Sequence, residues 1–261
     1  MEKTYFSRRL ASAIVSLAFL ALWSHAAVAQ NVQEPMDPAQ APAVSEDDPF
    51  ESWNRKVFAF NDGVDRWFLR PVAKAYRTVT PDLVDRGVTN FFSNLGEVGN
   101  FANSVLQGKG ESAVVAFGRF TFNTVFGLGG LFDVATSFDL PERQEDFGQT
   151  LAIWGVGSGP YLVMPFLGPS TPRHTTGFLT DGFALPSPWE AVEEPEWYYL
   201  RTLQVVDKRA DLIPAEGLIA GDRYTFMRNA FLQRREFLIN DGKVIDDPFA
   251  DDDEDLMLED F

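Results

Sequence analysis

The sequence predicts an all-α protein made of one mainly helical domain. Apolar side chains recur at helical spacing in several segments, no segment alternates between apolar and polar residues over several strands, and no internal repeat is present. The chain of 261 residues is also long enough to bury a substantial core.

The N-terminal residues predict export. Three basic residues precede an apolar run from Leu10 to Trp23, and Ala27-Val28-Ala29 follows as a small-residue cleavage site. The run is shorter than the roughly 20 residues that a membrane-spanning helix needs. We therefore expect residues 1–29 to be a cleaved signal peptide. Residues 30–47, rich in Pro, Ala, Gln and acidic residues, are expected to be a flexible linker.

Composition excludes several kinds of site and partner. The chain has no cysteine, so we expect neither a disulfide framework nor a lipid-bearing cysteine, and the folded body alone should hold the protein at a membrane. The formal net charge of −16 argues against a nucleic-acid partner. Acidic residues crowd the C-terminus without a base after residue 245, so residues 244–261 are expected to be an acidic disordered tail.

Four helices are predicted in the first half of the domain. The first begins at Asp48-Pro49, where Asp48 can cap it, and is expected to be broken by Pro71. A second starts at Thr80-Pro81-Asp82, and a third is expected from Leu95 to Gln107. A fourth, from Glu111 to Phe126, is apolar on more than one side. That pattern indicates either deep burial or contact with lipid.

An uncharged segment lies between Asp146 and Arg173. Its 26 residues are long enough to cross a bilayer, but Gly and Pro interrupt them, so one spanning helix is excluded. Irregular backbone is tolerated at membrane depth only where protein covers it or where it lines a wet cavity. The segment is therefore either the inside of a soluble domain or a re-entrant piece beside a channel. Two amphipathic helices are predicted after it, Trp197 to Ala210 and Asp222 to Asn240.

The sequence offers little for catalysis. His174 is the only histidine beyond the predicted signal peptide, and we expect it in a loop or on the surface. The glycine-rich run has Val156 where a nucleophile elbow requires glycine. Glu142, Glu145 and Asp146 form one acidic cluster, predicted to be a solvated turn. We expect no enzyme, no cofactor and no metal.

Several short motifs occur in order between about Asp48 and Lys243. The most distinctive is WGVGSGPYLVMPF, from Trp154 to Phe166. In this order the motifs resemble the MlaA (VacJ) family of outer-membrane phospholipid transport proteins. The other matching motifs are DPFESWNR from Asp48, Phe60-Asn61, RPVA from Arg70, SNL from Ser93, GRF from Gly118, NTVFGLGGLFD from Asn123 and FGQTL from Phe147.

The resemblance implies a ring-like helical domain embedded in the periplasmic leaflet of the outer membrane, with a glycine-rich hairpin beside a central channel. In this family, phospholipids that have strayed into the outer leaflet pass through the channel to the periplasmic carrier MlaC. The expected partners are therefore phospholipid, outer-membrane porin trimers and an MlaC-like carrier. Phe60-Asn61 falls at a position associated with control of the channel. The residues implied to belong to the hairpin near the channel are Gly155, Gly157, Gly159 and Pro160.

One feature of the sequence departs from the family. Familiar members are lipoproteins, whereas this sequence has no cysteine. We expect it at the periplasmic face of the outer membrane, exported through a cleaved signal peptide and without a lipoprotein cysteine. Two other functions stay open. One is a structural or adhesive envelope protein without lipid transport, and the other is a lipid or wall hydrolase that uses Glu145 or Asp146.

Overall fold

A computed structural model describes residues 48–219 and 221–243. The predicted signal peptide, linker and acidic tail all lie outside these residues. Two short strands and a series of helices make up the described part. They are α2 (Glu51–Val64), the π-helix η1 (Asp65–Leu69), α3 (Arg70–Val79), α4 (Asp82–Leu106), α5 (Gly110–Val125), the 3-10 helix η2 (Ala135–Phe138), α6 (Phe147–Ile153), β1 (Leu162–Met164), β2 (Gly168–Ser170), α7 (Pro172–Phe183), η3 (Pro188–Ala191), α8 (Glu196–Asp211), η4 (Pro214–Leu218) and α9 (Arg223–Ile239).

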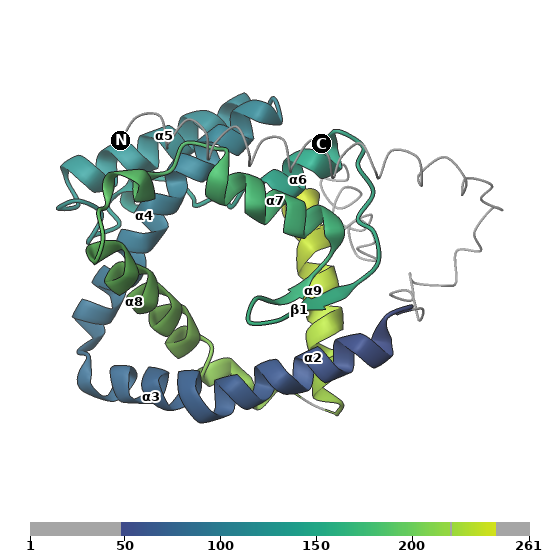
Figure 1. Ribbon diagram of the computed structural model, residues 1–261. Helices are drawn as coiled ribbons and strands as arrows, with labels where there is room; N and C mark the ends of the chain where they lie inside the picture. The colour runs from purple at the N-terminus through teal and green to yellow at the C-terminus, as the bar shows by residue number, and fades with distance from the viewer. Residues whose placement is uncertain (1–47, 220, 244–261) are drawn as a thin grey trace, which may run out of the picture.

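The helices form a ring (Figure 1). Helices α2 and α3 make one side, α4 the next, α5 to α7 lie across the opposite side, and α9 closes the ring next to α2. Helix α8 packs against both α3 and α4. The antiparallel hairpin of β1 and β2 projects into the ring, with β1 against α2 and β2 against α9. The predicted helical domain is confirmed, with a ring and an inner hairpin.

The expected break at Pro71 is wrong. Helical structure continues from Glu51 to Val79, and Pro71 occupies the first turn of α3. A proline inside an α-helix lacks an N–H and collides with the carbonyl four residues earlier. The π-helical turn just before it relieves that collision, because it widens the backbone, as the bond from the Arg70 N–H to the Asp65 carbonyl shows.

Helix α4 is one helix of 25 residues, where two segments were predicted. Amide and acidic residues interrupt the apolar pattern in its middle. In the structure they are the buried side of the helix: Asn94, Glu97, Asn100 and Asn103. The predicted start at Thr80-Pro81-Asp82 is confirmed.

Two helices were not predicted: α6, which lies in the uncharged segment, and α7, which begins at its last residue. Each is started by a side-chain cap. The Gln149 N–H donates to Asp146 Oδ1 at 2.9 Å at the start of α6, and the His174 N–H donates to Thr171 Oγ1 at 3.2 Å at the start of α7. The helices predicted over Glu111 to Phe126, Trp197 to Ala210 and Asp222 to Asn240 are present as α5, α8 and α9, within a few residues at their ends.

The interior of the α4 and α5 pair is polar. Eight of the ten largest fully buried side chains in the described part are polar, and four of the eight belong to this pair: Glu97, Asn103, Ser104 and Arg119. The apolar side chains that α5 buries are small or medium-sized: Ala113, Val115 and Ala116. On α5, Val114, Phe117 and Val125 are instead 72%, 60% and 63% exposed. Water-soluble proteins mostly bury apolar side chains and expose polar ones. An extended exposed apolar surface marks contact with lipid or protein. The apolar sides of α5 therefore face outward.

A hydrophobic cluster joins α2, β1 and α9. It consists of Val57, Tyr161, Val163 and Tyr224, with Phe231 and neighbouring apolar side chains packed against it. The rings of Tyr161 and Tyr224 meet edge to face at 6.2 Å. This cluster fixes the base of the hairpin between two helices that are far apart in sequence.

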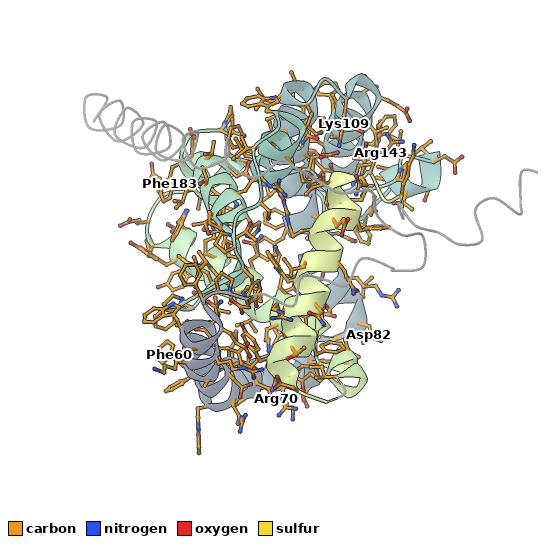
Figure 2. The ribbon with its side chains drawn as sticks, turned by 90° about the vertical axis from the view of Figure 1, so that its right-hand side faces the viewer. Phe60, Arg70, Asp82, Lys109, Arg143 and Phe183 are labelled. Carbon is orange, nitrogen blue, oxygen red and sulfur yellow. The ribbon has the colours of Figure 1, made fainter. Side chains whose placement is uncertain are left out.

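The ring has two unlike faces. Seen edge-on, Phe60 and Phe183 lie at one face, whereas Asp82, Lys109 and Arg143 lie toward the other (Figure 2). No helix in the described ranges is both long enough and apolar enough to cross a bilayer.

Candidate functional site

The hairpin inside the ring is the centre of the candidate site. Its strands pair antiparallel, with Val163 opposite Pro169 and Met164 opposite Gly168. At the turn, Phe166 has a φ of 64° and Gly168 a φ of 81°, both in the left-handed region. Such a conformation is natural for glycine and strained for phenylalanine. Phe166 is also 74% exposed, so the tip carries an unburied aromatic ring.

Asn54 of α2 fixes the first strand by hydrogen bonds to its backbone. Its amide nitrogen donates to the Tyr161 carbonyl at 3.0 Å, and its oxygen accepts from the Val163 N–H at 2.8 Å. The same nitrogen donates to Asp48 Oδ1 at 2.9 Å. Asn54 is completely buried. Because a side-chain amide has the same donor and acceptor as a peptide group, Asn54 stands in for a neighbouring strand.

Asn61 repeats this arrangement two helical turns later. Its nitrogen donates to the Met164 carbonyl at 2.9 Å, and its oxygen accepts from the Phe166 N–H at 2.8 Å. Residues seven apart lie on one face of a helix, so both asparagines point at the same strand. Phe60 adds an edge-to-face contact with Phe166, with ring centroids 5.2 Å apart. The structure thus brings the predicted pair Phe60-Asn61 to the tip of the hairpin.

The predicted glycines lie in the segment that leads into the hairpin. Gly155 ends α6 with a φ of 86°, and the next N–H, of Val156, donates back to the Leu151 carbonyl at 2.9 Å, a common helix ending. Gly159 also has a positive φ, of 72°, and Pro160 follows it directly. Gly157 has no positive φ and open space where a side chain would begin.

Arg173 ties this glycine segment to α7. Its Nη1 donates to the Val156 carbonyl at 2.8 Å, and its N–H donates to the Ser158 carbonyl at 3.3 Å. Sequence reasoning singled out the glycines and Phe60-Asn61 but gave no role to Asn54 or Arg173. The seven-residue spacing of Asn54 and Asn61 on one helix was the available signal for the first of these.

The frame around the hairpin is held by a buried ion pair. Arg119 of α5 contacts Glu97 of α4 at 2.6 Å and Asp133 at 3.0 Å, and it donates to the Leu140 carbonyl at 2.5 Å. Burial raises the pKa of Glu97, against the opposing effects of Asn100 and Arg119. A single arginine therefore joins two helices to the long loop that follows α5.

The predicted solvated turn is wrong for two of its three acidic residues, because only Glu142 is exposed. Asp146 caps α6 and forms an ion pair with Arg235 of α9 at 2.5 Å. Burial opposes ionisation of Asp146, but Arg235 outweighs it and lowers the pKa. Glu145 is buried and pairs with Lys109 at 2.9 Å. Two carboxylates that are each neutralised by a cation are suited to joining segments rather than to acid–base catalysis.

His174 lies in α7 and not in a loop. Its Nδ1 is 3.0 Å from Ser170 Oγ, and its ring meets Phe231 edge to face at 5.4 Å. Burial, followed by the charge of Arg235, lowers its pKa. Ser170 is 4% exposed, also contacts Thr175, and lines neither of the cavities described below. This serine and histidine pair therefore joins β2 to α7.

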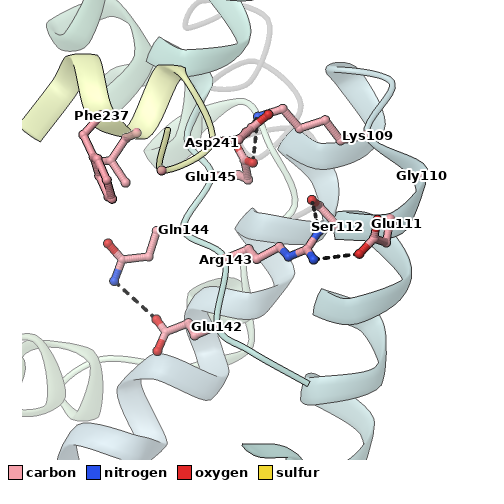
Figure 3. A pocket seen from close by; sticks show the side chains of 12 residues that line it. Lys109, Gly110, Glu111, Ser112, Glu142, Arg143, Gln144, Glu145, Phe237 and Asp241 are labelled. Atoms are coloured by element: carbon pink, nitrogen blue, oxygen red, sulfur yellow. Dashed lines mark hydrogen bonds and ion pairs between the residues drawn. The ribbon is translucent and has the colours of Figure 1, made fainter. Parts of the chain in front are cut away.

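Two cavities differ in their lining. The first, of about 570 Å³, is charged, and Figure 3 shows Arg143 reaching Ser112 and Glu111 while Lys109 lies between Glu145 and Asp241. Each cation there already has an acidic partner. The second, of about 380 Å³, opens beside Asn61 and is lined mainly by apolar side chains of α2, α9 and the turn after α8.

Comparisons with known proteins agree with this architecture. A family model described as MlaA lipoprotein matches residues 46–238. The intermembrane phospholipid transport system lipoprotein MlaA of Haemophilus influenzae is 37% identical over 204 residues, covering 76% of this chain and 82% of the relative. The protein of the same name from Escherichia coli K12 is 37% identical over 206 residues, covering 76% and 80%.

A solved structure is similar as well. It is described as the structural basis for maintenance of bacterial outer membrane lipid asymmetry. It aligns with a TM-score of 0.66 and 35% identity, covering 74% of this chain and 99% of that one. At 35% sequence identity the two proteins share more than a fold, so the ring of helices is common to both relatives.

The relatives correct one expectation and settle the family. They are named lipoproteins, which implies a lipidated cysteine, so the expectation that such a protein does without a lipoprotein cysteine is contradicted. The absence of cysteine from the 261 residues stands as a difference in composition. Placement at the outer membrane agrees with the similar structure. By the match over most of its length, its relatives and its ring of helices, the chain belongs to the MlaA lipoprotein family.

Proposed function

We propose that this protein acts in intermembrane phospholipid transport. In this proposal it removes mislocalised phospholipid from the outer leaflet of the outer membrane through an amphipathic channel, and passes it to a periplasmic lipid carrier. The observation that carries the proposal is the inverted distribution of side chains in α4 and α5, with polar groups inward and apolar groups outward. The names of the relatives supply the cargo, which is phospholipid.

The inverted helices suit a ring that lies in one leaflet. Apolar side chains such as Val114 and Phe117 are stabilised by about 25 cal/mol for each Å² that leaves water. Charged groups cost several kcal/mol in hydrocarbon. The face with Phe60 and Phe183 therefore looks toward the membrane interior, and the face with Lys109 and Arg143 looks toward the periplasm (Figure 2).

The hairpin is the part of this proposed channel best placed to control passage. It projects into the ring, and its tip is held by the two hydrogen bonds of Asn61 and the ring of Phe60. Each such hydrogen bond contributes only about 0.5–1.5 kcal/mol, so displacing the tip costs little. The segment that leads into the hairpin, with Gly155, Gly157, Gly159 and Pro160, can absorb the change in backbone direction.

Transport of this kind breaks no bond, so we propose no enzymatic step. Direction is set by the partners. A porin trimer holds the ring in the outer membrane, and an MlaC-like carrier takes lipid from the periplasmic face. Both partners come from the family resemblance.

The proposal is tested first by what the protein binds. The full chain is extracted from outer membranes in mild detergent, and its lipid is identified by mass spectrometry. We expect bound diacyl phospholipid. Release of a lipid-free protein into buffer would support an adhesive or structural protein instead, and production of lysolipid would support a hydrolase.

A second test uses a strain that lacks the protein. Phospholipid in the outer leaflet is measured after complementation with wild type, with Gly155, Gly157 and Gly159 all changed to Val, or with Phe60-Asn61 deleted. We expect the first variant to accumulate outer-leaflet phospholipid and the second to change flux. Gly217→Val, at an exposed glycine with open space around it, is the matched control. Normal clearance in both variants would contradict the role of the hairpin.

A further inference from the structure

Arg201 of α8 is a half-buried cation without an acidic partner. Its Nη1 donates to Gln204 Oε1 at 3.1 Å, and its Nε is buried with no hydrogen-bond partner. No carboxylate pairs with it within the described ranges. Arg209, two turns further along the same helix, is paired with both Asp65 and Glu216. Burial alone lowers the pKa of Arg201, with no charged neighbour opposing it.

Aromatic rings hold the guanidinium group in place. Its central carbon lies 3.9 Å from the ring centroid of Trp189 and 5.6 Å from that of Trp197. Trp189 is itself stacked on Phe92 of α4, at 6.0 Å with planes 20° apart. The site therefore joins α4, η3 and the first turns of α8. A guanidinium that lies over the face of a ring keeps its N–H groups in its own plane, where their edges can still reach another partner.

This arrangement is incomplete without an anion. Arginine carries five N–H donors, and one of the Arg201 groups makes the bond described above. A buried donor with no acceptor destabilises the fold, and more so when it is charged. A phosphate group offers two oxygens that match the arginine fork. Tryptophan and tyrosine are also the side chains preferred where a membrane meets water, and Tyr198 and Tyr199 beside the site are 53% and 70% exposed.

We infer that Arg201, seated on Trp189 and Trp197, binds the phosphodiester group of a phospholipid. The inference rests on the proposed function for the source of that group. Among the described cations, Arg228 and Arg234 also lack an acidic partner, but their hydrogen bonds go to Asn229 and Gln144 and not to a site built on aromatic rings. Arg55 does lie over a ring, that of Tyr224, but it is paired with Glu51 and Asp222. The site gives the ring a fixed point of contact for a headgroup, apart from the hairpin.

The test measures binding of defined lipids to the full chain in a phosphate-free detergent. Isothermal titration calorimetry uses dihexanoyl phosphatidylglycerol, dihexanoylglycerol, which has the same chains without phosphate, and glycerol phosphate, which has no chains. The variants are Arg201→Gln and Arg201→Lys. The control is Lys208→Ala, which removes an exposed cation from the same helix. Thermal unfolding of each variant shows whether the fold is kept.

We expect Arg201→Gln to raise the dissociation constant of the phospholipid at least tenfold and to leave that of dihexanoylglycerol unchanged. Arg201→Lys should fall between, because it keeps the charge and loses the fork. Lys208→Ala should bind as wild type. Equal phospholipid binding by wild type and Arg201→Gln would overturn this inference and leave the proposed function standing. Glycerol phosphate binding as tightly as the lipid would overturn the lipid source, and a wild type that binds no phospholipid would overturn both proposals.

Discussion

Helices α4 and α5 and the hairpin region, which comprises α2, β1, β2 and α9, are held together in opposite ways. The helix pair buries Arg119 against Glu97 and exposes its apolar side chains. The hairpin region buries an apolar cluster around Tyr161 and Val163, and fixes its strand through two asparagines. A buried charge cannot leave its partner cheaply, whereas an amide contact can be exchanged for water. The difference separates a fixed frame from a part that can move.

The comparison is tested most severely at Arg119. Changing Arg119→Met leaves Glu97 buried without its cation, which typically costs about 3–5 kcal/mol. We expect a large fall in the thermal unfolding midpoint in detergent. Arg143→Met, which removes a surface pair with Glu111, should change stability by less than about 1 kcal/mol. Similar effects of the two substitutions would show that the polar interior is not the frame.

The hairpin region is tested at its two asparagines. Asn54→Leu removes the partners of the Tyr161 carbonyl and the Val163 N–H, both buried, and we expect a loss of about 2–3 kcal/mol. Asn61→Leu should cost less, because the Phe166 N–H at the tip can bond to water. Hydrogen exchange measures both. Protection should fall at Val163 in the first variant and only at Phe166 in the second, so loss of protection along the whole hairpin from Asn61→Leu would contradict two separate attachments.

A third prediction concerns how far polar burial extends from α4 to α8. Asp207 of α8 accepts hydrogen bonds from Tyr76 and from Thr89 of α4. Burial, with Asp211 and Asp85, raises its pKa from 3.8 to about 6. The folded protein therefore holds this proton where the unfolded chain has released it. Stability should fall as pH rises from about 4 to about 6, and stay lower above that range.

Asp207→Asn should remove the part of this pH dependence that Asp207 contributes, and should leave the part due to Asp181, whose pKa burial also raises to about 6. The amide can donate to the Thr89 oxygen while the Thr89 hydroxyl donates to the Asp85 carbonyl, so the contacts survive. We expect about 1–2 kcal/mol more stability at pH 7 and none at pH 4, measured by thermal unfolding. A variant that is equally destabilised at both pH values would show that the carboxylate is ionised when folded.

Sequence patterns predicted the outer elements of this fold better than its interior. The start at Thr80-Pro81-Asp82 and the long amphipathic helices were found because a proline at a helix start and helical spacing are local signals. The predicted cap at Asp48 is wrong, because α2 begins at Glu51 with Phe50 at its N-cap position and without a side-chain cap. Helix α4 was divided because a buried face is normally apolar, and here it carries Asn94, Glu97 and Asn100. No rule of spacing reveals that a polar stripe faces inward while apolar side chains of the neighbouring helix face outward.

For the candidate site, the sequence likewise predicted some residues but not the contacts that they make. Phe60-Asn61 and the glycines were named from motifs, but their partners depend on contacts more than 100 residues away, such as Asn61 with Met164. Arg201 had no signal at all, because its role depends on Trp189 lying against it and on its having no ion pair with an acid of the described ranges. Pairing of charges across a fold cannot be read from one sequence.

The smallest effect distinguishes the glycines from one another. Gly155 has a φ of 86°, which an alanine adopts only at a cost of about 1–2 kcal/mol, whereas Gly157 has an ordinary φ and open space beside it. Gly155→Ala should therefore lower the unfolding midpoint slightly and weaken the end of α6, and Gly157→Ala should be neutral within about 0.5 kcal/mol. Paired unfolding curves measure this. Gly157→Ala could nevertheless impair lipid clearance without changing stability. In that case the glycine is needed in a second position of the hairpin and not in the position seen in this structure. Movement of the hairpin tip would then be part of the mechanism.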